Sequence, residues 1–138
     1  MSTDEQAAAY LDEARLTLTS ARAIYRAATA EHEALWADVV KNGYDAIEQA
    51  VSAGIAAREE RIPRAHPAKI QTFVDLHQPP EHLEEVLLHW LQRRSDSQYI
   101  DIRGDELNVP HRLFDEDDAG RILEDAETVI DYVTDHIQ

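Results

Sequence analysis

The chain has 138 residues, no cysteine and a formal charge of −15 at pH 7, set by 28 Asp and Glu against 13 Lys and Arg. This length predicts one domain, residues 1–138, large enough to bury a core without a metal or disulfide staple. The absence of cysteine excludes disulfides, thiolate zinc sites and a cysteine nucleophile.

The charge pattern and the N-terminal residues predict the salt environment and the cellular compartment of the protein. Only Lys41 and Lys69 are lysines, so eleven of the thirteen basic residues are arginines. An acidic chain with so little lysine is typical of halophilic proteins, because high salt screens the self-repulsion. Net acidity in such a proteome does not exclude a nucleic-acid ligand. Residues 1–5 carry acid where a signal peptide needs base, and no apolar stretch reaches the roughly 18 residues of a membrane span. We therefore expect a cytoplasmic protein without a membrane contact.

Apolar residues recur at helical spacing along most of the chain and predict five helices. The first begins at a capping box of Thr3 and Gln6 and runs to about residue 29. The second follows, with Trp36 on its buried ridge. It must end before Pro63, because proline lacks the amide hydrogen and disfavours helix in the residue before it.

The third helix is short, opened by His66-Pro67 and closed by Pro79-Pro80. The fourth carries an apolar stripe from Leu83 to Leu91 and ends at the polar residues 95–97. A connection over about 96–114 follows, with residues 99–102 briefly extended, and Asp115 is the predicted N-cap of the last helix. Five helices in this order predict an all-α, up-and-down bundle. Connections as long as the one before Asp115 are usually functional or mobile, so a site is expected there.

Four segments of the sequence carry a resemblance to a known family. They are Tyr44-Asp45-Ala46-Ile47-Glu48 in the second helix, His66 before the third, the tract Arg93-Arg94-Ser95-Asp96-Ser97-Gln98-Tyr99 after the fourth, and the acidic-then-apolar segment from Phe114 to Ile137. In this order, over about residues 7–137, the chain resembles the HEPN family of helical domains. The resemblance implies a five-helix HEPN-like bundle that often forms a homodimer.

The resemblance also implies an activity. Many members are encoded beside a minimal nucleotidyltransferase and form a toxin–antitoxin-like pair with it. Many are metal-independent ribonucleases in which an arginine is followed, after four to six residues, by a histidine. Arginine can hold the scissile phosphate while histidine shuttles the proton of the 2′-hydroxyl. Here four residues after Arg94 lead to Tyr99, which departs from that pattern and makes a poor base near neutral pH.

The resemblance places the expected site around that tract. Arg94, Asp96 and Tyr99 are the expected catalytic residues: Arg94 contacts phosphate, Asp96 orients the guanidinium, and Tyr99 positions the substrate or receives a modification. Arg93 and His66 are the expected substrate-binding residues. The alternatives are that both arginines only complement the helix dipole and that His66 only caps its helix.

Other patterns are weaker. Arg61 and His66 have the arginine–histidine spacing, but they follow the second helix instead of the fourth. His82, Glu85 and His89 share one side of the fourth helix, yet a solvated polar face explains them better than a metal site. No metal and no cofactor are predicted. Trp36 and Trp90 are expected to pack in the core.

The predicted function is therefore an RNA-targeting, toxin-like component that acts with a nucleotidyltransferase antitoxin partner. Its catalytic motif is degenerate, so activity as a metal-independent endoribonuclease is left open. RNA or a nucleotide is the expected ligand, and a homodimer the expected assembly. The alternative is a non-enzymatic nucleotide-binding or dimeric protein-interaction module.

Overall fold

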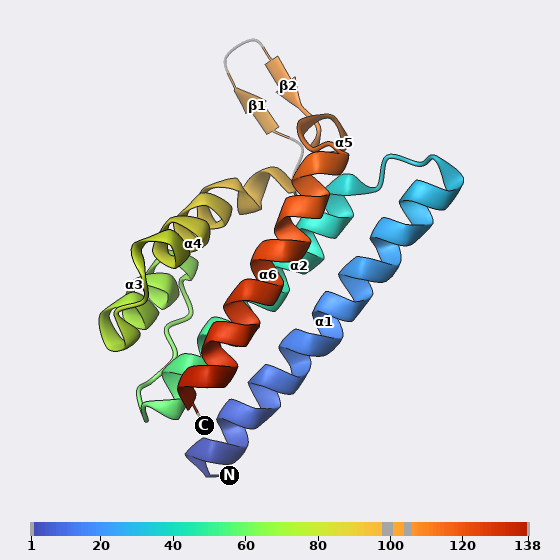
Figure 1. Cartoon of the computed structure of the whole chain (residues 1–138). Coiled ribbons are helices and arrows are strands. Elements are labelled where there is room, and N and C mark those ends of the chain that lie inside the picture. The colour runs from blue at the N-terminus through green and yellow to red at the C-terminus, as the bar shows by residue number, and fades with distance from the viewer. Residues whose placement is uncertain (1, 98–100, 104–105, 138) are drawn as a thin grey trace.

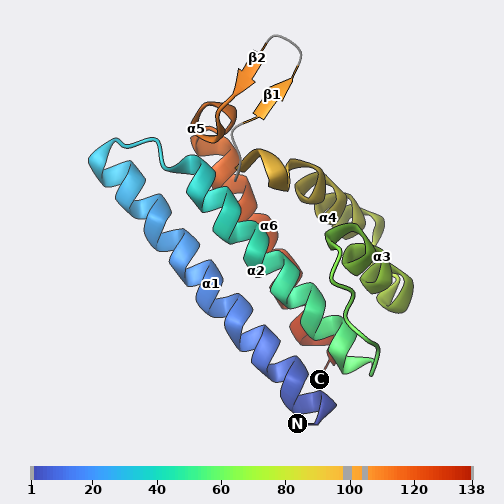
Figure 2. The same cartoon turned by 180° about the vertical axis from the view of Figure 1, so that it is seen from behind.

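The computed structural model describes residues 2–97, 101–103 and 106–137, and these form a helical bundle with one short β-hairpin. Three long helices run side by side: α1 (Thr3–Glu31), α2 (Trp36–Ala57) and α6 (Glu116–Ile137) (Figure 1). The shorter α3 (His66–His77) and α4 (Glu81–Arg93) lie on the side of α2 that faces away from α1 (Figure 2). The all-α prediction is confirmed.

Helix α2 occupies the centre of the bundle, because it contacts α1, α3, α4 and α6. Its composition explains this position, since small and β-branched residues cover nearly all of its faces and a helix that is apolar all round must be buried. Fourteen of its residues are buried: Ala37, Val39, Val40, Gly43, Tyr44, Ala46, Ile47, Ala50, Val51, Ser52, Ala53, Gly54, Ile55 and Ala56. The polar residues that remain on α2 therefore lie close to neighbouring helices.

The connection between α4 and α6 contains more structure than predicted. It holds a 3₁₀ turn, η1 (Arg94–Ser97), two antiparallel strands, β1 (Asp101–Arg103) and β2 (Glu106–Asn108), and a four-residue helix, α5 (Pro110–Leu113). The expectation of five α-helices was therefore one short, since α5 is a sixth. A proline in its first turn suits helix initiation, but four residues are too few to show an apolar period.

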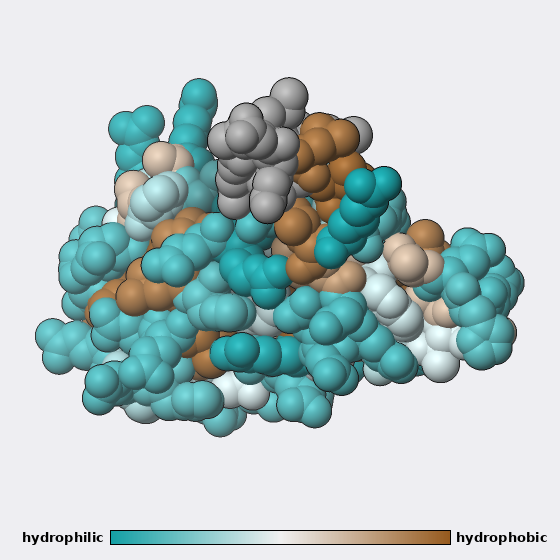
Figure 3. Space-filling view, turned by 90° about the horizontal axis from the view of Figure 1, so that it is seen from above, coloured by the Kyte–Doolittle hydropathy of each residue, from teal (hydrophilic) through white to brown (hydrophobic). Residues whose placement is uncertain are grey.

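The hairpin projects from the end of the bundle opposite to both termini (Figure 1). Seen from that end, the surface is mostly hydrophilic, with apolar side chains gathered in a few places (Figure 3). None of the described helices combines the length and the apolar character needed to cross a bilayer.

The helix caps were predicted with mixed success. Asp115 is confirmed as the cap of α6, because its carboxylate accepts from Asp118 N at 2.9 Å while Asp118 accepts from Asp115 N at 3.0 Å. The capping box of Thr3 and Gln6 was wrong by one residue. Ser2 is the N-cap of α1 and pairs with Glu5. Serine and threonine are both favoured N-cap residues, so the sequence offers both Ser2 and Thr3, and the backbone conformation decides between them.

Both tryptophans were expected to pack in the core, and they differ in how deeply they are buried. Trp90 is fully buried and donates its indole hydrogen to Asp125 at 2.7 Å. Trp36 is only partly buried, at the start of α2, where its ring lies 5.5 Å from that of Tyr25 on α1.

Two glycines of α2 permit close helix packing. A Cβ atom at Gly43 would lie 2.6 Å from Cγ1 of Ile122 on α6, and one at Gly54 would lie 2.6 Å from Cε2 of Phe73 on α3. Real Cβ atoms do not approach other carbons so closely, so glycine is required at both positions. The glycine at 120, in α6, has only the Tyr25 hydroxyl near it, at 3.9 Å.

We therefore expect Gly43→Ala to destabilise the protein by about 1–3 kcal/mol, because overpacking outweighs the gain in helix propensity. Gly120→Ala is the matched control and should instead raise stability by up to about 1 kcal/mol, since it gains propensity without a clash. Thermal and denaturant unfolding in molar potassium chloride measure both. Equal effects of the two substitutions would show that close approach at Gly43 is unimportant.

Candidate functional site

Polar side chains gather where α2 meets the start of α3 and the η1 turn. Tyr44, Asp45 and Glu48 come from α2, His66 and Lys69 from α3, and Arg94 from η1. We call these six residues the polar cluster. Residues four apart share one face of a helix, which places Tyr44 and Glu48 on the side of α2 that faces α3.

Glu48 is the hub of the polar cluster. One carboxylate oxygen lies 2.5 Å from Nδ1 of His66, and the other accepts from Nζ of Lys69 at 2.7 Å. The side chains of Glu48 and Lys69 are only 13% and 14% exposed, whereas that of His66 is 38% exposed. The two contacts tie the first turn of α3 to the middle of α2.

The surroundings of Glu48 act on its pKa in opposite directions. Burial alone would raise the pKa of this carboxyl group, but the hydrogen bonds from Lys69 and His66 outweigh burial and lower it below its ordinary value of 4.5. Glu48 is therefore ionised at neutral pH. Asp45 behaves differently: burial, and then the charge of Glu48, raise its pKa.

Tyr44 lies between Arg94 and His66, two of the three basic residues of the polar cluster. The guanidinium carbon of Arg94 lies 5.8 Å from the centre of the Tyr44 ring, and the His66 ring packs edge-on against it at 6.4 Å. Burial, together with the charge of Glu48, raises the pKa of Tyr44 far above its ordinary value of 10.0. The phenol is therefore neutral at any physiological pH.

Unsatisfied polar atoms concentrate in this region. Within the described part of the chain, four buried side-chain atoms have no hydrogen-bond partner: Tyr44 Oη, Gln49 Oε1, His89 Nε2 and Arg94 Nε. The Tyr44 hydroxyl lies near Glu48 but without hydrogen-bond geometry. Two of these atoms belong to the polar cluster and a third to the residue after Glu48. Orphaned buried groups are costly, and a bound ligand is one explanation for keeping them.

A cavity of about 200 Å³ adjoins the polar cluster. Asp45, Glu48 and Lys69 form part of its wall, and Tyr10 of α1 and Ile62 of the α2–α3 loop form another part. The cavity therefore combines charged groups with aromatic and aliphatic surface, as ligand pockets commonly do.

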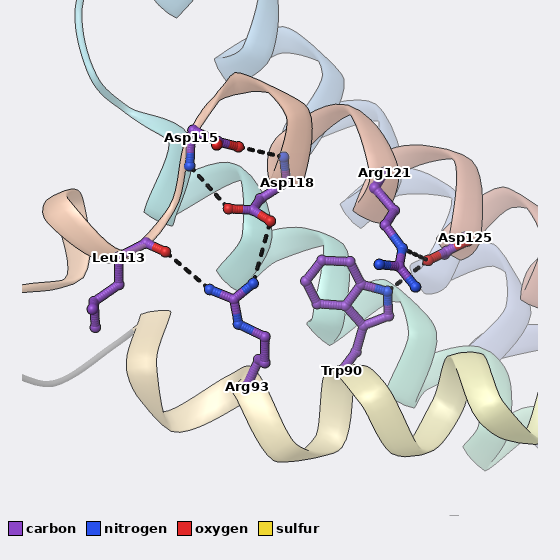
Figure 4. A network of polar contacts seen from close by, with 7 residues as sticks. All are labelled: Trp90, Arg93, Leu113, Asp115, Asp118, Arg121 and Asp125. Atoms are coloured by element: carbon purple, nitrogen blue, oxygen red, sulfur yellow. Dashed lines mark hydrogen bonds and ion pairs between the residues drawn. The ribbon is translucent and has the colours of Figure 1, made fainter.

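Arg93 occupies a different place from Arg94, although the two are adjacent. Its guanidinium donates to Asp118 at 3.2 Å and to the carbonyl of Leu113 at 2.9 Å (Figure 4). It also lies 4.3 Å from the centre of the Phe114 ring. These contacts join the end of α4 to the start of α6. Arg93 is thereby occupied by protein groups, which leaves Arg94 as the arginine with an unused donor.

The same interface contains a second link, between Trp90 and α6. Asp125 accepts from the indole of Trp90 and pairs with Arg121 at 3.5 Å (Figure 4). His89 packs edge-on against Trp90, and burial, followed by the charges of Arg121 and Arg93, lowers its pKa. This interface positions the η1 turn, and hence Arg94, relative to α2.

Of the residues predicted for the site, the structure brings Arg94 and His66 together around Tyr44. Asp96 is partly buried in the same turn as Arg94, and its orienting role stays a prediction. Tyr99 lies outside the described residues. The metal alternative receives no support, since the described residues contain no group of three His, Asp or Glu side chains suited to an ion.

Sequence reasoning missed Glu48, Tyr44 and Lys69 as site residues. A signal was present, because acidic side chains inside an otherwise apolar helix are unusual and need partners. The spacing of His66 and Lys69, three residues apart in α3, also places both on one face of that helix. The partners themselves lie 18 and 21 residues from Glu48, which no local pattern reveals.

We expect Glu48→Gln to destabilise the protein by about 1–3 kcal/mol at pH 7, because Lys69 would lose its partner while remaining mostly buried. Since the pKa of Glu48 is lowered on folding, its stabilising contribution is present above pH 4.5 and is lost as the pH falls through its folded value. The difference between wild type and Glu48→Gln, measured by denaturant unfolding, should therefore shrink as the pH falls below 4.5. A difference that stays constant with acid would mean that the carboxylate charge contributes nothing.

Comparison with known proteins agrees with the helical class of the fold. A family model described as the HEPN domain matches residues 5–136, nearly the whole chain. No curated protein and no solved structure matches it. The chain belongs to the HEPN domain family.

Proposed function

We propose that this HEPN domain binds RNA through the phosphate backbone, with Arg94 as the phosphate-binding residue, and that it is the RNA-targeting, toxin-like member of a pair with a nucleotidyltransferase-type protein. HEPN domains are generally ribonucleases or nucleotide-binding domains. The observation that carries the proposal is the state of Arg94. Its guanidinium is partly buried over Tyr44, and its Nε has no acceptor.

The chemistry of Arg94 suits a phosphate. A guanidinium presents donors in a planar fork that matches two phosphate oxygens, and partial burial strengthens the contact relative to one in water. No described carboxylate forms an ion pair with Arg94, although the chain carries 28 acidic residues. The ion pairs among the described residues therefore leave the charge of Arg94 available to an anion.

The charge of the whole chain does not assist this binding. At −15 the protein repels a polyanion at long range, so RNA must be held by local contacts in salt that screens the repulsion. The affinity should therefore fall less steeply with salt than for a basic RNA-binding protein. In a homodimer, which the family placement favours, two copies of Arg94 would contact one RNA strand.

The alternative is a nucleotide-binding or dimeric interaction module without catalysis. If the ligand is a nucleotide, Arg94 would still contact its phosphate. If the function is assembly alone, Arg94 would have no role in it. The cavity beside the polar cluster, at about 200 Å³, is the observation in its favour. Competition by a mononucleotide separates a nucleotide site from an RNA site.

We expect Arg94→Ala to weaken the binding of single-stranded RNA about 10- to 100-fold, which corresponds to the loss of one charge-assisted contact. Fluorescence anisotropy with a labelled oligonucleotide in molar potassium chloride gives the dissociation constants. Arg22→Ala is the matched control. It removes the same charge from an exposed arginine of α1 that pairs with Glu127, and should leave binding unchanged. Equal affinity of the Arg94 variant and wild type would remove the basis of the proposal.

Arg93→Ala should lower the stability of the protein more than its affinity for RNA, in contrast to Arg94→Ala. It removes two hydrogen bonds and the packing on Phe114, so we expect a loss of about 1–3 kcal/mol in unfolding free energy. RNA affinity of the folded fraction should fall much less than in Arg94→Ala, because Arg93 acts on the site only by holding the η1 turn in place. Unfolding curves and anisotropy titrations on the same samples distinguish the two arginines. A large loss of affinity in a fully folded Arg93 variant would place the phosphate contact on Arg93 instead.

A further inference from the structure

The cavity of about 200 Å³ beside the polar cluster has one polar wall, and α2 forms most of it. Helix α2 contributes Asp45, Glu48, Gln49 and Ser52 to the lining. Their spacing of three, four and seven positions places all four side chains on a single face of the helix. Polar groups on a buried helix need partners, and only Glu48 receives them from the protein, on α3.

The other three side chains of this wall have no hydrogen-bond partner in the described part of the chain. Ser52 is only 3% exposed, yet its hydroxyl makes no hydrogen bond to a described residue. The side-chain oxygen of Gln49 is buried and also lacks a donor. No described basic residue forms an ion pair with Asp45. Buried polar groups are nearly always satisfied in native proteins, so three together on one cavity wall point to a ligand that completes them.

The charge of the wall favours a cation. Glu48 and Lys69 neutralise each other through their 2.7 Å ion pair, which leaves the carboxylate of Asp45. Burial, and then the charge of Glu48, raise the pKa of Asp45 and outweigh the basic residues in its neighbourhood. The protein therefore supplies no adequate counter-ion for this carboxylate, and a cationic ligand would supply one. An anionic ligand would be repelled by it.

The size of the cavity and the spacing of the groups set the length of the ligand. The volume corresponds to roughly seven water molecules in the liquid, which is enough for a chain of about five to seven non-hydrogen atoms. At a rise of about 1.5 Å per residue, Asp45 and Ser52 lie roughly 10 Å apart along α2, too far for one ammonium group to contact both. Asp45 and Gln49 are about one turn apart, and the three donors of an ammonium group can serve both. A second polar group, at the other end of the ligand, then reaches Ser52.

We propose that this cavity binds a short amino alcohol, with its ammonium group on Asp45 and Gln49 and its hydroxyl group on Ser52. Tyr10 of α1 and Ile62 of the α2–α3 loop supply aromatic and aliphatic surface for the carbon chain between the two ends. The site is distinct from the phosphate contact at Arg94 and does not depend on it.

The test is a titration of isotope-labelled wild type with 4-aminobutan-1-ol, followed by two-dimensional NMR at pH 7 in molar potassium chloride. An alkylamine is protonated at this pH, as lysine is. We expect saturable binding, with shifts of the side-chain amide of Gln49 and of the backbone amides of Asp45 and Ser52. The neutral probe 1,4-butanediol and the anionic probe 4-hydroxybutyrate have the same length. Each should bind at least about tenfold more weakly, because each lacks the charged donor for Asp45.

Variants assign the two ends of the ligand. Asp45→Asn should weaken the binding of 4-aminobutan-1-ol by about tenfold or more. Ser52→Ala should weaken it by about three- to tenfold but should leave the affinity for butylamine, which has no hydroxyl group, unchanged. Asp117→Asn is the matched control, since it removes an exposed carboxylate of α6, and it should bind as wild type does. Unfolding curves of the same samples show which variants are folded, and the comparison of probes on wild type needs no variant.

Three results would overturn the inference. Equal affinity for 4-aminobutan-1-ol and 1,4-butanediol would show that Asp45 does not select a cation. Tighter binding of 4-hydroxybutyrate would make the cavity an anion site. Shifts that do not saturate, or that spare Gln49 and Ser52, would show that the amine does not occupy this cavity. None of these results bears on the proposed function, which is read from the RNA affinity of wild type and Arg94→Ala.

Discussion

The enclosure of α2 is the constraint on which the rest of the structure depends. Helices on several sides cover it, so each polar group that it carries must find a partner on another element or remain unsatisfied. Glu48 finds two partners on α3, and this pairing sets the position of α3. Tyr44 finds none for its hydroxyl, and its ring instead receives Arg94 and His66. The packing of the core and the geometry of the candidate site are therefore one arrangement.

The attachment of α4 to α6 supports this arrangement from the other side. Arg93 and Trp90 lie one turn apart on α4, and each donates to an aspartate of α6, Asp118 and Asp125 respectively. These bonds are partly buried, where hydrogen bonds to charged groups contribute more than at the surface. They hold the end of α4 in place, so the turn that follows can present Arg94 to Tyr44. Adjacent arginines thus have distinct roles, one in the protein interior and one at the polar cluster.

The composition of the site bears on the proposed binding of RNA by so acidic a protein. General attraction is absent at a charge of −15, so specificity and affinity must come from a few well-placed groups. Arg94 offers a directional cationic donor, and the Glu48–His66 pair fixes the orientation of an imidazole. Fixed groups of this kind need little reorganisation when a ligand binds, which favours recognition. Contacts from these few oriented groups would take the place of the long-range electrostatic attraction by which a basic protein binds RNA.

The amino-acid sequence alone determined the helical class, most of the element boundaries and the cap at Asp115, because these follow from local period and capping chemistry. The family resemblance placed Arg94 and His66 in the expected site, and their roles stay predictions. The sequence did not reveal α5, which is too short to show a period, or the role of Arg93, whose partners are 20 and 25 residues away. Only the tertiary structure decided that Glu48 joins His66 and Lys69 and that Tyr44 separates His66 from Arg94. The physical reason is that a hydrogen bond depends on distance in space, whereas helical periodicity reports only which face of its own helix a residue occupies.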